Sequence, residues 1–337
     1  MRTRLEFEII SRDFFVGFCL FGLLVISFAT RGSALNLSVS ASTQQATKPD
    51  WCKPLPRPEY KALQRVKIAD PWFEVYMVAP NTFAIYEPHQ AEEVISYLIV
   101  GKQKALLFDT GMGISDIRKV TRELTPLPII VLNSHTHNDH VGGNWQFDTI
   151  YSMDTAFTRQ NAKGGSSVDA QAEIAAGQIC GELPKSFDGK SYRTKPWTIT
   201  KFVRDFETID LGGRSLEIMA TPGHTPDAIS LIDHANGLLF TGDTYYPAPI
   251  WLYRPETDFA AYENSIERLA ALAPQIKLVL GAHNVPVASP AVLSKLVAGF
   301  AQVRAGNARC KPEGSTQKLC EAYSITFLLS ATAPEVH

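Results

Sequence analysis

The stretch His135-Thr136-His137-Asn138-Asp139-His140 decides how this 337-residue chain is interpreted. It follows the apolar run Ile129–Leu132, which predicts a buried strand that ends at the first histidine. A buried imidazole needs a partner for each ring nitrogen, and a buried carboxylate needs a counter-charge. A divalent cation would supply the charge that three imidazoles and an aspartate need, so the stretch predicts a metal site. The alternative is an exposed polar loop.

Three further segments place a metal-capable residue directly after an apolar run, in a turn that contains glycine. They are Thr221-Pro222-Gly223-His224, Gly242-Asp243-Thr244 and Gly281-Ala282-His283. Glycine lets the backbone turn sharply and approach a site closely. Five of the eight histidines fall in these motifs and the first stretch, so the metal hypothesis does not depend on any single histidine.

The motifs supply more candidate ligands than one tetrahedral zinc ion can take. The seven candidates are His135, His137, Asp139, His140, His224, Asp243 and His283. This number suits two metal ions that share a carboxylate. In an extended segment, residues two apart point the same way, so the first two histidines are expected to bind one ion. Nitrogen and oxygen ligands without thiolate favour two Zn²⁺ ions, with iron and manganese as alternatives.

Short apolar runs predict strands, and amphipathic segments predict helices. The expected strands cover 75–78, 83–86, 96–100, 105–108, 129–132, 198–203, 207–211, 216–220, 228–232, 238–241 and 278–280. The expected helices cover 114–124, 259–272 and 290–303. Residues 154–190 are expected to be mostly helical and polar, as a flexible insertion over the site. Two strand-rich halves, each followed by helices, predict an α/β fold: a four-layer αββα sandwich of two mainly antiparallel or mixed sheets with helices on both outer faces.

The N-terminus predicts export. The apolar run Phe14–Ala29 follows two arginines, so residues 1–34 are expected to be a secretory signal peptide. A retained membrane anchor is the alternative, although a run of about 16 residues is shorter than the ~20 that span a bilayer. We expect a flexible or irregular segment over 35–67, a catalytic domain over 68–308 and a C-terminal extension over 309–337. The protein would then be secreted or periplasmic.

Four cysteines remain after the leader, and they allow three pairings. Cys310 and Cys320 enclose a polar segment with Pro312 and Gly314, so this pair is the expected disulfide. The pair Cys52–Cys180 would follow by elimination. Four free thiols are the alternative, which an oxidising compartment disfavours.

The order of these motifs closely resembles the metallo-β-lactamase-fold hydrolase superfamily over about residues 73–305. The resemblance rests on Asp109 in Phe-Asp-Thr-Gly, the 135–140 stretch, His224, Asp243 and His283. It implies that the first metal is held by His135, His137 and His224. It implies that Asp139, His140 and His283 hold the second metal, that Asp243 bridges the two, and that Asp109 orients the site.

The resemblance also implies a reaction, in which a metal-bridging hydroxide attacks a carbonyl and Asp139 helps to move its proton. Asp243 stands where zinc β-lactamases carry Cys or Ser, so the chain is closer to lactonases and glyoxalase II. Tyr246 lies three residues later, as in similar lactonases, and is expected to hydrogen-bond the substrate carbonyl; a packed turn residue is the alternative. The expected substrate is a small-molecule lactone, ester or thioester.

Other functions remain as alternatives. They are hydrolysis of a β-lactam, a persulfide dioxygenase that uses one iron, a nuclease and a non-catalytic metal-binding protein. The net charge is -2 and no run of Lys or Arg occurs, which disfavours a nucleic-acid partner. The presence of all seven ligands disfavours a non-catalytic protein. No membrane partner is expected after the leader is removed, and the sequence leaves the oligomeric state open.

Overall fold

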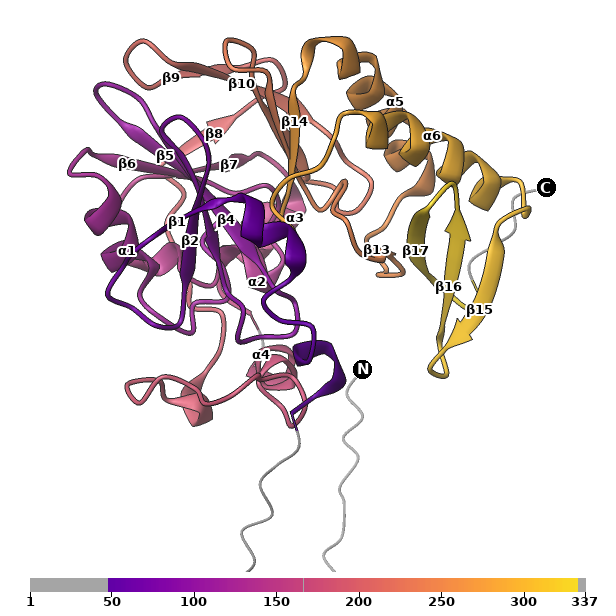
Figure 1. Cartoon of the computed structure of the whole chain (residues 1–337), viewed down its shortest axis with the longest axis horizontal. Helices are drawn as coiled ribbons and strands as arrows, with labels where there is room; N and C mark the ends of the chain where they lie inside the picture. Colours follow the sequence, from indigo (N-terminus) through magenta and orange to yellow (C-terminus); the bar gives the residue numbers. More distant parts are fainter. Residues whose placement is uncertain (1–47, 166, 333–337) are drawn as a thin grey trace, which may run out of the picture. The chain divides into compact units, whose positions relative to one another are not determined.

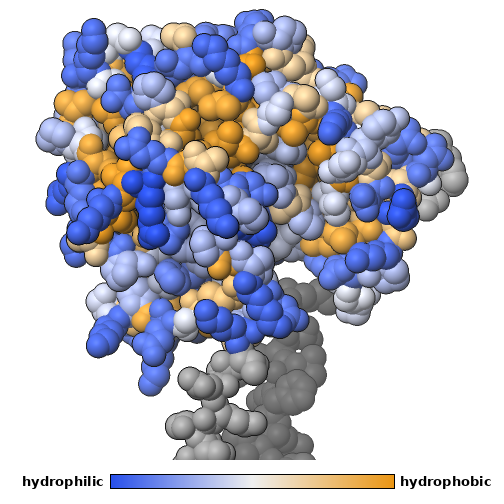
Figure 2. All heavy atoms as spheres, in the orientation of Figure 1, coloured by the Kyte–Doolittle hydropathy of each residue, from blue (hydrophilic) through white to orange (hydrophobic). Residues whose placement is uncertain are grey.

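We describe residues 48–165 and 167–332 of a computed structural model of the chain (Figure 1). The predicted signal peptide, residues 1–34, lies outside these described residues. Within them, no helix is both long enough and apolar enough to cross a bilayer. On the face drawn in Figure 2, hydrophilic side chains are interspersed with hydrophobic patches rather than separated from them.

The first sheet has eight strands that lie side by side in chain order. Neighbours from β1 to β5 are antiparallel, whereas β5 to β8 run parallel. The change occurs where α1 connects β5 to β6, since a parallel pair needs a crossover connection. The strands are β1 Gln64–Val66, β2 Glu74–Ala79, β3 Thr82–Tyr86, β4 Ile95–Val100, β5 Ala105–Phe108, β6 Ile129–Leu132, β7 Ile150–Met153 and β8 Lys201–Val203.

The second sheet has five strands in the order β14-β12-β11-β10-β9. Its neighbours are antiparallel except for β12 and β14, which run parallel. The strands are β9 Thr208–Asp210, β10 Ser215–Ala220, β11 Ile229–Asp233, β12 Leu238–Gly242 and β14 Leu278–Gly281.

A third sheet of four strands, in the order β13-β17-β16-β15, was not predicted. It joins β13 from the middle of the chain to a C-terminal meander. The segment expected as a polar loop between Cys310 and Cys320 is therefore a hairpin, because backbone pairing continues through its polar residues. The strands are β13 Ile250–Leu252, β15 Arg309–Glu313, β16 Gln317–Ala322 and β17 Ile325–Ser330.

Six α-helices and five short 3₁₀ helices occur in the described residues. The α-helices are α1 Ile117–Leu124, α2 Asn138–Val141, α3 Ala156–Asn161, α4 Ser167–Glu173, α5 Phe259–Ala271 and α6 Ala291–Arg304. The 3₁₀ helices are Asp50–Cys52, Pro58–Ala62, Asn144–Gln146, Gly189–Ser191 and Ala273–Gln275. The expectation that 154–190 is mostly helical is wrong, because only α3, α4 and one 3₁₀ turn form there and the glycines interrupt the rest.

The helix expected over 114–124 begins later, at Ile117. Its N-cap is Asp116, whose side chain accepts a hydrogen bond from the backbone N–H of Lys119 at 3.1 Å. A carboxylate in this position satisfies one of the free donors of the first turn. Ile117 and Val120 of this helix are buried against the first sheet.

Three cores separate the layers. The central core lies between the two larger sheets, where Tyr97 and Phe108 of the first meet Phe240 of the second. In β12, Leu238 and Phe240 face this core while Leu239 faces the helices α5 and α6, as the two-residue period of a strand requires. The predicted αββα sandwich is therefore confirmed.

Both expected disulfides are present, Cys52–Cys180 and Cys310–Cys320. The second joins residues that are paired across β15 and β16. The first joins the N-terminal segment to the insertion after α4, over a sequence separation of 128 residues. It brings a segment expected to be irregular into contact with the body of the fold.

Candidate metal centre

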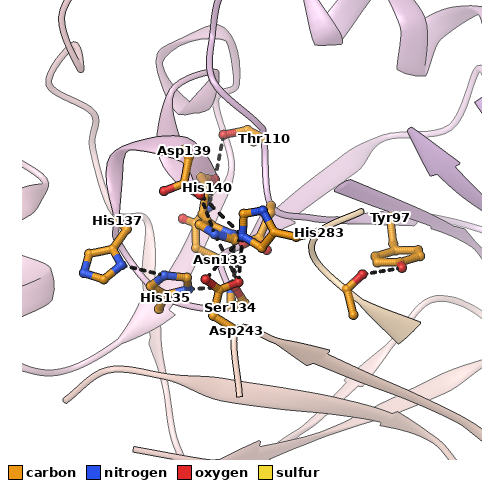
Figure 3. A network of polar contacts seen from close by, with 12 residues as sticks. Tyr97, Thr110, Asn133, Ser134, His135, His137, Asp139, His140, Asp243 and His283 are labelled. Atoms are coloured by element: carbon orange, nitrogen blue, oxygen red, sulfur yellow. Dashed lines mark hydrogen bonds and ion pairs between the residues drawn. The ribbon is translucent and has the colours of Figure 1, made fainter. Parts of the chain in front are cut away.

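The four sequence motifs meet where strands of the two facing sheets end. The 135–140 stretch follows β6 of the first sheet, whereas His224, Asp243 and His283 follow β10, β12 and β14 of the second. Figure 3 shows Asp243 and His283 directed toward the histidines of the 135–140 stretch. Each sheet therefore contributes to one cluster at the edge of the sandwich.

Ligand atoms of three histidines converge on one point. We call these residues, His135, His137 and His224, the first group. Nδ1 of His137 lies 3.0 Å from Nε2 of His135 and 3.0 Å from Nε2 of His224. Zinc–nitrogen bonds of about 2.0 Å place tetrahedral ligand atoms roughly 3.3 Å apart. The spacing of these three nitrogens is close to that value, so they can hold one zinc ion with a further position open.

Asp139, His140 and His283 form the second group. Nε2 of His140 lies 3.0 Å from Oδ2 of Asp139, and Nε2 of His283 lies 3.6 Å from the same oxygen. This group mixes a carboxylate with two imidazoles, a donor set that also suits zinc.

The Asp243 carboxylate lies between the two groups. Its Oδ1 is 3.3 Å from Nε2 of His140 and 3.1 Å from Nε2 of His283. Its Oδ2 is 3.6 Å from Nε2 of His224, in the first group. One side chain thus faces ligand atoms of both groups, as a bridging ligand must.

Each of the five histidines uses its other ring nitrogen for a hydrogen bond away from the cluster. Such bonds fix the orientation of the ring and decide which nitrogen carries the proton. The partners are Ser134 Oγ for His135 at 3.0 Å, Glu256 Oε1 for His137 at 2.7 Å, Asp109 Oδ2 for His140 at 3.0 Å, the Trp251 carbonyl for His224 at 2.7 Å and the Glu92 carbonyl for His283 at 2.6 Å. With the outer nitrogens occupied in this way, the inner nitrogens are oriented as metal ligands.

Asp109 supports the cluster from the end of β5. Its backbone has a φ of 67°, a region that few residues other than glycine adopt. Its Oδ1 accepts a hydrogen bond from the backbone N–H of Ser134 at 2.6 Å, while Oδ2 accepts one from His140. The carboxylate is thereby held between the histidine stretch and the sheet, which fits the predicted orienting role.

The residues present fit two metal ions. Among the described buried side chains, Nε2 of His140 and Oδ1 of Asp243 have no hydrogen-bond partner. A buried polar atom without a partner costs about 1–3 kcal/mol. A cation in contact with both atoms would remove this cost.

The two groups differ in charge. Burial lowers the pKa of His224 to about 4, and it lowers the pKa of His135 well below its usual range. Burial also acts to lower the pKa of His283, but Asp243 and Asp139 outweigh it and raise the value to about 9. His135 and His224 of the first group are therefore neutral imidazoles, whereas the second group contains ion pairs.

Two glycine turns are needed to bring the second sheet to the cluster. Gly242 has a φ of 50°, and a Cβ there would lie 2.5 Å from Cβ of Ser134. Gly223 has a φ of 142°, and a Cβ there would lie 2.3 Å from Cα of Tyr262. Any side chain at either position would push the following ligand out of place.

Tyr246 lies beside the cluster, but its hydroxyl is engaged elsewhere. Its ring centroid is 4.7 Å from that of His283. The hydroxyl donates to the carbonyl of Pro249 at 3.0 Å and accepts from the backbone N–H of Trp251 at 3.1 Å. In this arrangement Tyr246 holds the start of β13, where Trp251 supplies the carbonyl partner of His224.

The structure thus brings all seven candidate ligands into one cluster and places Asp109 against it. The sequence did not indicate the outer partners Glu256, Glu92 and Trp251. Two of them act through backbone carbonyls, which leave no side-chain signal, and Glu256 follows a strand that was not predicted.

A cleft opens onto the cluster. A small cavity of about 20 Å³ is lined by Tyr246, Trp251 and five of the seven candidate ligands, which are His137, Asp139, His224, Asp243 and His283. It adjoins a larger cavity of about 310 Å³, and both share Glu173 and Arg254 in their walls. A substrate in the larger cavity would therefore lie next to the metal ligands.

Comparison with known proteins decides the family. The model described as "Metallo-beta-lactamase superfamily" matches residues 92–283, more than half of the chain. The chain belongs to this superfamily. The resemblance predicted from the order of the motifs is confirmed.

Two relatives in the metallo-beta-lactamase superfamily are thioester hydrolases by name. The chain is 24% identical over 201 residues to acyl-coenzyme A thioesterase MBLAC2 of Homo sapiens, which covers 56% of this chain and 71% of that protein. It is 26% identical over 184 residues to hydroxyacylglutathione hydrolase GloC of Haemophilus influenzae, which covers 53% of this chain and 80% of that protein. Among solved structures, DIM-1 metallo-beta-lactamase has a TM-score of 0.51 at 14% identity and covers 70% of this chain and 100% of its own. At that identity the structural likeness shows the metallo-beta-lactamase fold alone.

Proposed function

We propose that the protein is a binuclear zinc hydrolase that cleaves a small-molecule thioester, ester or lactone. The observation that carries the proposal is the position of Asp243. Its Oδ1 lies within 3.3 Å of two nitrogens of the second group, and its Oδ2 faces His224 of the first. A carboxylate shared in this way suits two adjacent cations, which act together in hydrolysis.

Zinc is the metal that the donor set supports best. All candidate ligand atoms are imidazole nitrogens or carboxylate oxygens, and the four described cysteines are paired in disulfides. When bound, the cations polarise the substrate carbonyl and lower the pKa of water towards about 7. The chain's own task is to hold the ligands, orient the substrate and move the proton.

Asp139 is the group placed to move that proton. Its side chain is 13% exposed, against 7% for Asp243, and it lines the small cavity next to the cluster. Although burial would raise the pKa of Asp139, His140 and His283 lower it. The carboxylate is therefore ionised at neutral pH and can accept a proton from the attacking water.

The larger cavity supports a small substrate. Its volume of about 310 Å³ is near the lower end for ligand pockets, which span roughly 300–1,000 Å³. Val141 and Phe157 give it an apolar wall, and Arg254 lies at the junction with the metal cleft. An acyl group can lie against the apolar wall while the carbonyl reaches the metals.

Thioesters stand first among the proposed substrates. The relatives named acyl-coenzyme A thioesterase and hydroxyacylglutathione hydrolase support this choice. Hydrolysis of a β-lactam ranks lower, because Asp243 occupies the position at which zinc β-lactamases carry Cys or Ser by resemblance. The disulfides support the proposal that the enzyme works outside the cytosol, as the predicted signal peptide requires.

The test is a hydrolysis screen of the purified zinc-loaded protein against a small-thiol thioester, an aryl ester, a lactone and a β-lactam. We expect the thioester to be cleaved fastest. His283→Ala should abolish the activity, whereas His234→Ala should leave it unchanged, because His234 is exposed and pairs only with Glu217. Equal activity of the two variants would overturn the proposed site.

Metal analysis of the protein as purified, before any zinc is added, separates the hydrolase from an oxidoreductase. Two zinc ions per chain are expected. One iron per chain without zinc would contradict the proposal and favour a persulfide dioxygenase.

A further inference from the structure

The segment before the first sheet carries contacts that reach the second group of ligands. We call residues 50–62 the N-terminal strap; it lies outside the 92–283 region that matches the superfamily. Tyr60 of the strap is buried, and its ring stacks on Tyr86 of β3 with centroids 4.6 Å apart. The strap, which belongs to the segment predicted to be flexible or irregular, is thus packed against the first sheet.

The strap supplies an arginine, Arg57, whose positive charge pairs with the buried carboxylate of Glu93. Glu93 is 1% exposed, and Arg57 donates to both of its oxygens, with Nε at 2.8 Å from Oε2. Tyr86 donates its hydroxyl to the same carboxylate, and Asn284 donates its side-chain N–H at 3.0 Å. We call this arrangement the Glu93 clamp.

The Glu93 clamp holds the neighbours of the ligand His283 on both sides. Asn284 follows His283 directly, and its backbone N–H donates to the Glu93 carbonyl at 3.1 Å. The residue before Glu93 is Glu92, whose carbonyl accepts the hydrogen bond from His283 Nδ1 at 2.6 Å. Both the ligand and its acceptor are therefore attached to residues that the clamp fixes.

The backbone at the clamp adopts conformations that need support. Glu93 has a φ of 47° and Asn284 a φ of 64°. Residues other than glycine rarely adopt a positive φ unless surrounding contacts impose it. Tyr60 adds one such contact, because its hydroxyl donates to the Asn284 carbonyl at 3.0 Å.

The strap is itself anchored at its other end. Cys52 forms the disulfide with Cys180, and Trp51 donates its indole N–H to the Gly177 carbonyl at 2.7 Å. Figure 1 shows the strap, in indigo, beside the segment that follows α4. The strap therefore runs from the insertion to the clamp as a fixed connection.

We propose that the N-terminal strap positions His283 through the Glu93 clamp and thereby sets the affinity of the second metal. Arg57 is a positioning residue in this proposal, because it acts through Glu93 and touches neither metal nor substrate. The inference rests on the proposed two-metal centre, and it adds a determinant outside the region shared with the superfamily.

The experiment measures zinc binding by the full chain, by stoichiometry and by competition with a chelator. In Arg57→Gln the first zinc should bind as in the wild type, while affinity for the second should fall by roughly 10–100-fold, the usual loss when an outer partner of a ligand is removed. The matched control is Arg65→Gln. Arg65 also belongs to the N-terminal part of the chain and pairs with Glu74 at 2.9 Å, but it is 62% exposed and makes no contact with the clamp. It should bind both ions normally.

Thermal unfolding of the zinc-free variants tests a purely structural role. If Arg57→Gln lowers the melting temperature but binds both ions as tightly as the wild type, the proposal is overturned. An equal loss at both metal sites would also overturn it. Should Arg57→Gln fail to fold, Tyr60→Phe is the deciding variant. It removes only the Tyr60 hydroxyl that donates to the Asn284 carbonyl. We expect a smaller loss of zinc affinity, confined to the second site.

The wild-type result separates this inference from the proposed function. A wild type that binds one metal contradicts the two-metal hydrolase itself. A wild type that binds two, with Arg57→Gln unchanged, contradicts only the role of the strap.

Discussion

The two ligand groups sit side by side in one cluster but are built differently. The first group has three imidazoles, and burial lowers the pKa of two of them, His135 and His224. The second group has Asp139 and two histidines, of which His283 has its pKa raised by neighbouring carboxylates. A cation in the first group would meet neutral imidazoles at His135 and His224. A cation in the second group would displace the proton of His283, which the neighbouring carboxylates stabilise.

The groups also differ in what supports them. The first relies on partners from β13 and the segment after it, such as the Trp251 carbonyl and Glu256. The second relies on Asp109 of the first sheet and, through His283, on the Glu93 clamp and the N-terminal strap. Support for the second group thus extends beyond the segment that defines the superfamily, so mutations should be able to perturb the two groups separately.

The largest effect should follow from removing the residue that joins the two groups. Asp243→Ala takes away the shared carboxylate, so bound metal should fall from two per chain towards one. Hydrolysis should fall by at least about a hundredfold, the upper end of the loss seen for mere outer partners. The measurements are metal content by mass spectrometry and the rate on the best substrate. Asp154→Ala, at an exposed aspartate, serves as the control, and retention of two metals by Asp243→Ala would refute the bridging assignment.

Two variants that each weaken a hydrogen-bond acceptor outside the cluster should lower zinc affinity at different groups. Asp109→Asn weakens the acceptor for His140 and should lower the affinity of the second metal by roughly 10–100-fold. Glu256→Gln weakens the acceptor for His137 and should lower that of the first. Chelator competition on both variants gives the two affinities. If both variants lower zinc affinity at the same site, the conclusion that the two groups have separate supports is wrong.

Proton release should distinguish the groups at neutral pH. Without metal, His283 has a pKa of about 9 and is protonated at pH 7, so a cation must displace its proton. His224 has a pKa of about 4 and is already neutral. The pKa of His140 is raised as well, so the second zinc should release protons on binding and bind more tightly as the pH rises towards 9, by at least about tenfold per pH unit. His224 should contribute no proton release above about pH 5. Calorimetric titration at pH 7 in two buffers of different ionisation enthalpy counts the protons, and equal release at both steps would contradict the charge difference.

The comparison also shows how far sequence reasoning reaches. The seven candidate ligands could be identified because each is a metal-capable side chain directly after an apolar run. The αββα layers followed from alternating strands and helices. The supports of the second group could not be predicted, because Glu92 acts through its carbonyl and Arg57 meets Glu93 only once the chain has folded.

The same limit explains two of the missed strands. In β15 and β16 the residues are mostly polar or exposed, so no apolar alternation marks them. Their pairing is set by the hairpin and by the disulfide between Cys310 and Cys320. Tertiary contacts, rather than local sequence preference, decide this part of the fold.

The smallest effect is expected at Tyr246, which touches the second group without belonging to it. The sequence predicted that its hydroxyl contacts the substrate carbonyl, whereas the structure shows it bonded to the loop of Pro249 and Trp251. Tyr246→Phe should keep both metals, because no ligand atom is removed, and should slow hydrolysis by less than about tenfold, the value of one hydrogen bond. The form of the loss is decisive. A lower kcat with unchanged KM indicates a contact made in the transition state, whereas a higher KM with unchanged kcat indicates that the hydroxyl shapes the cleft through its loop. Full activity would remove Tyr246 from the mechanism and leave the chemistry to the two ligand groups and Asp139.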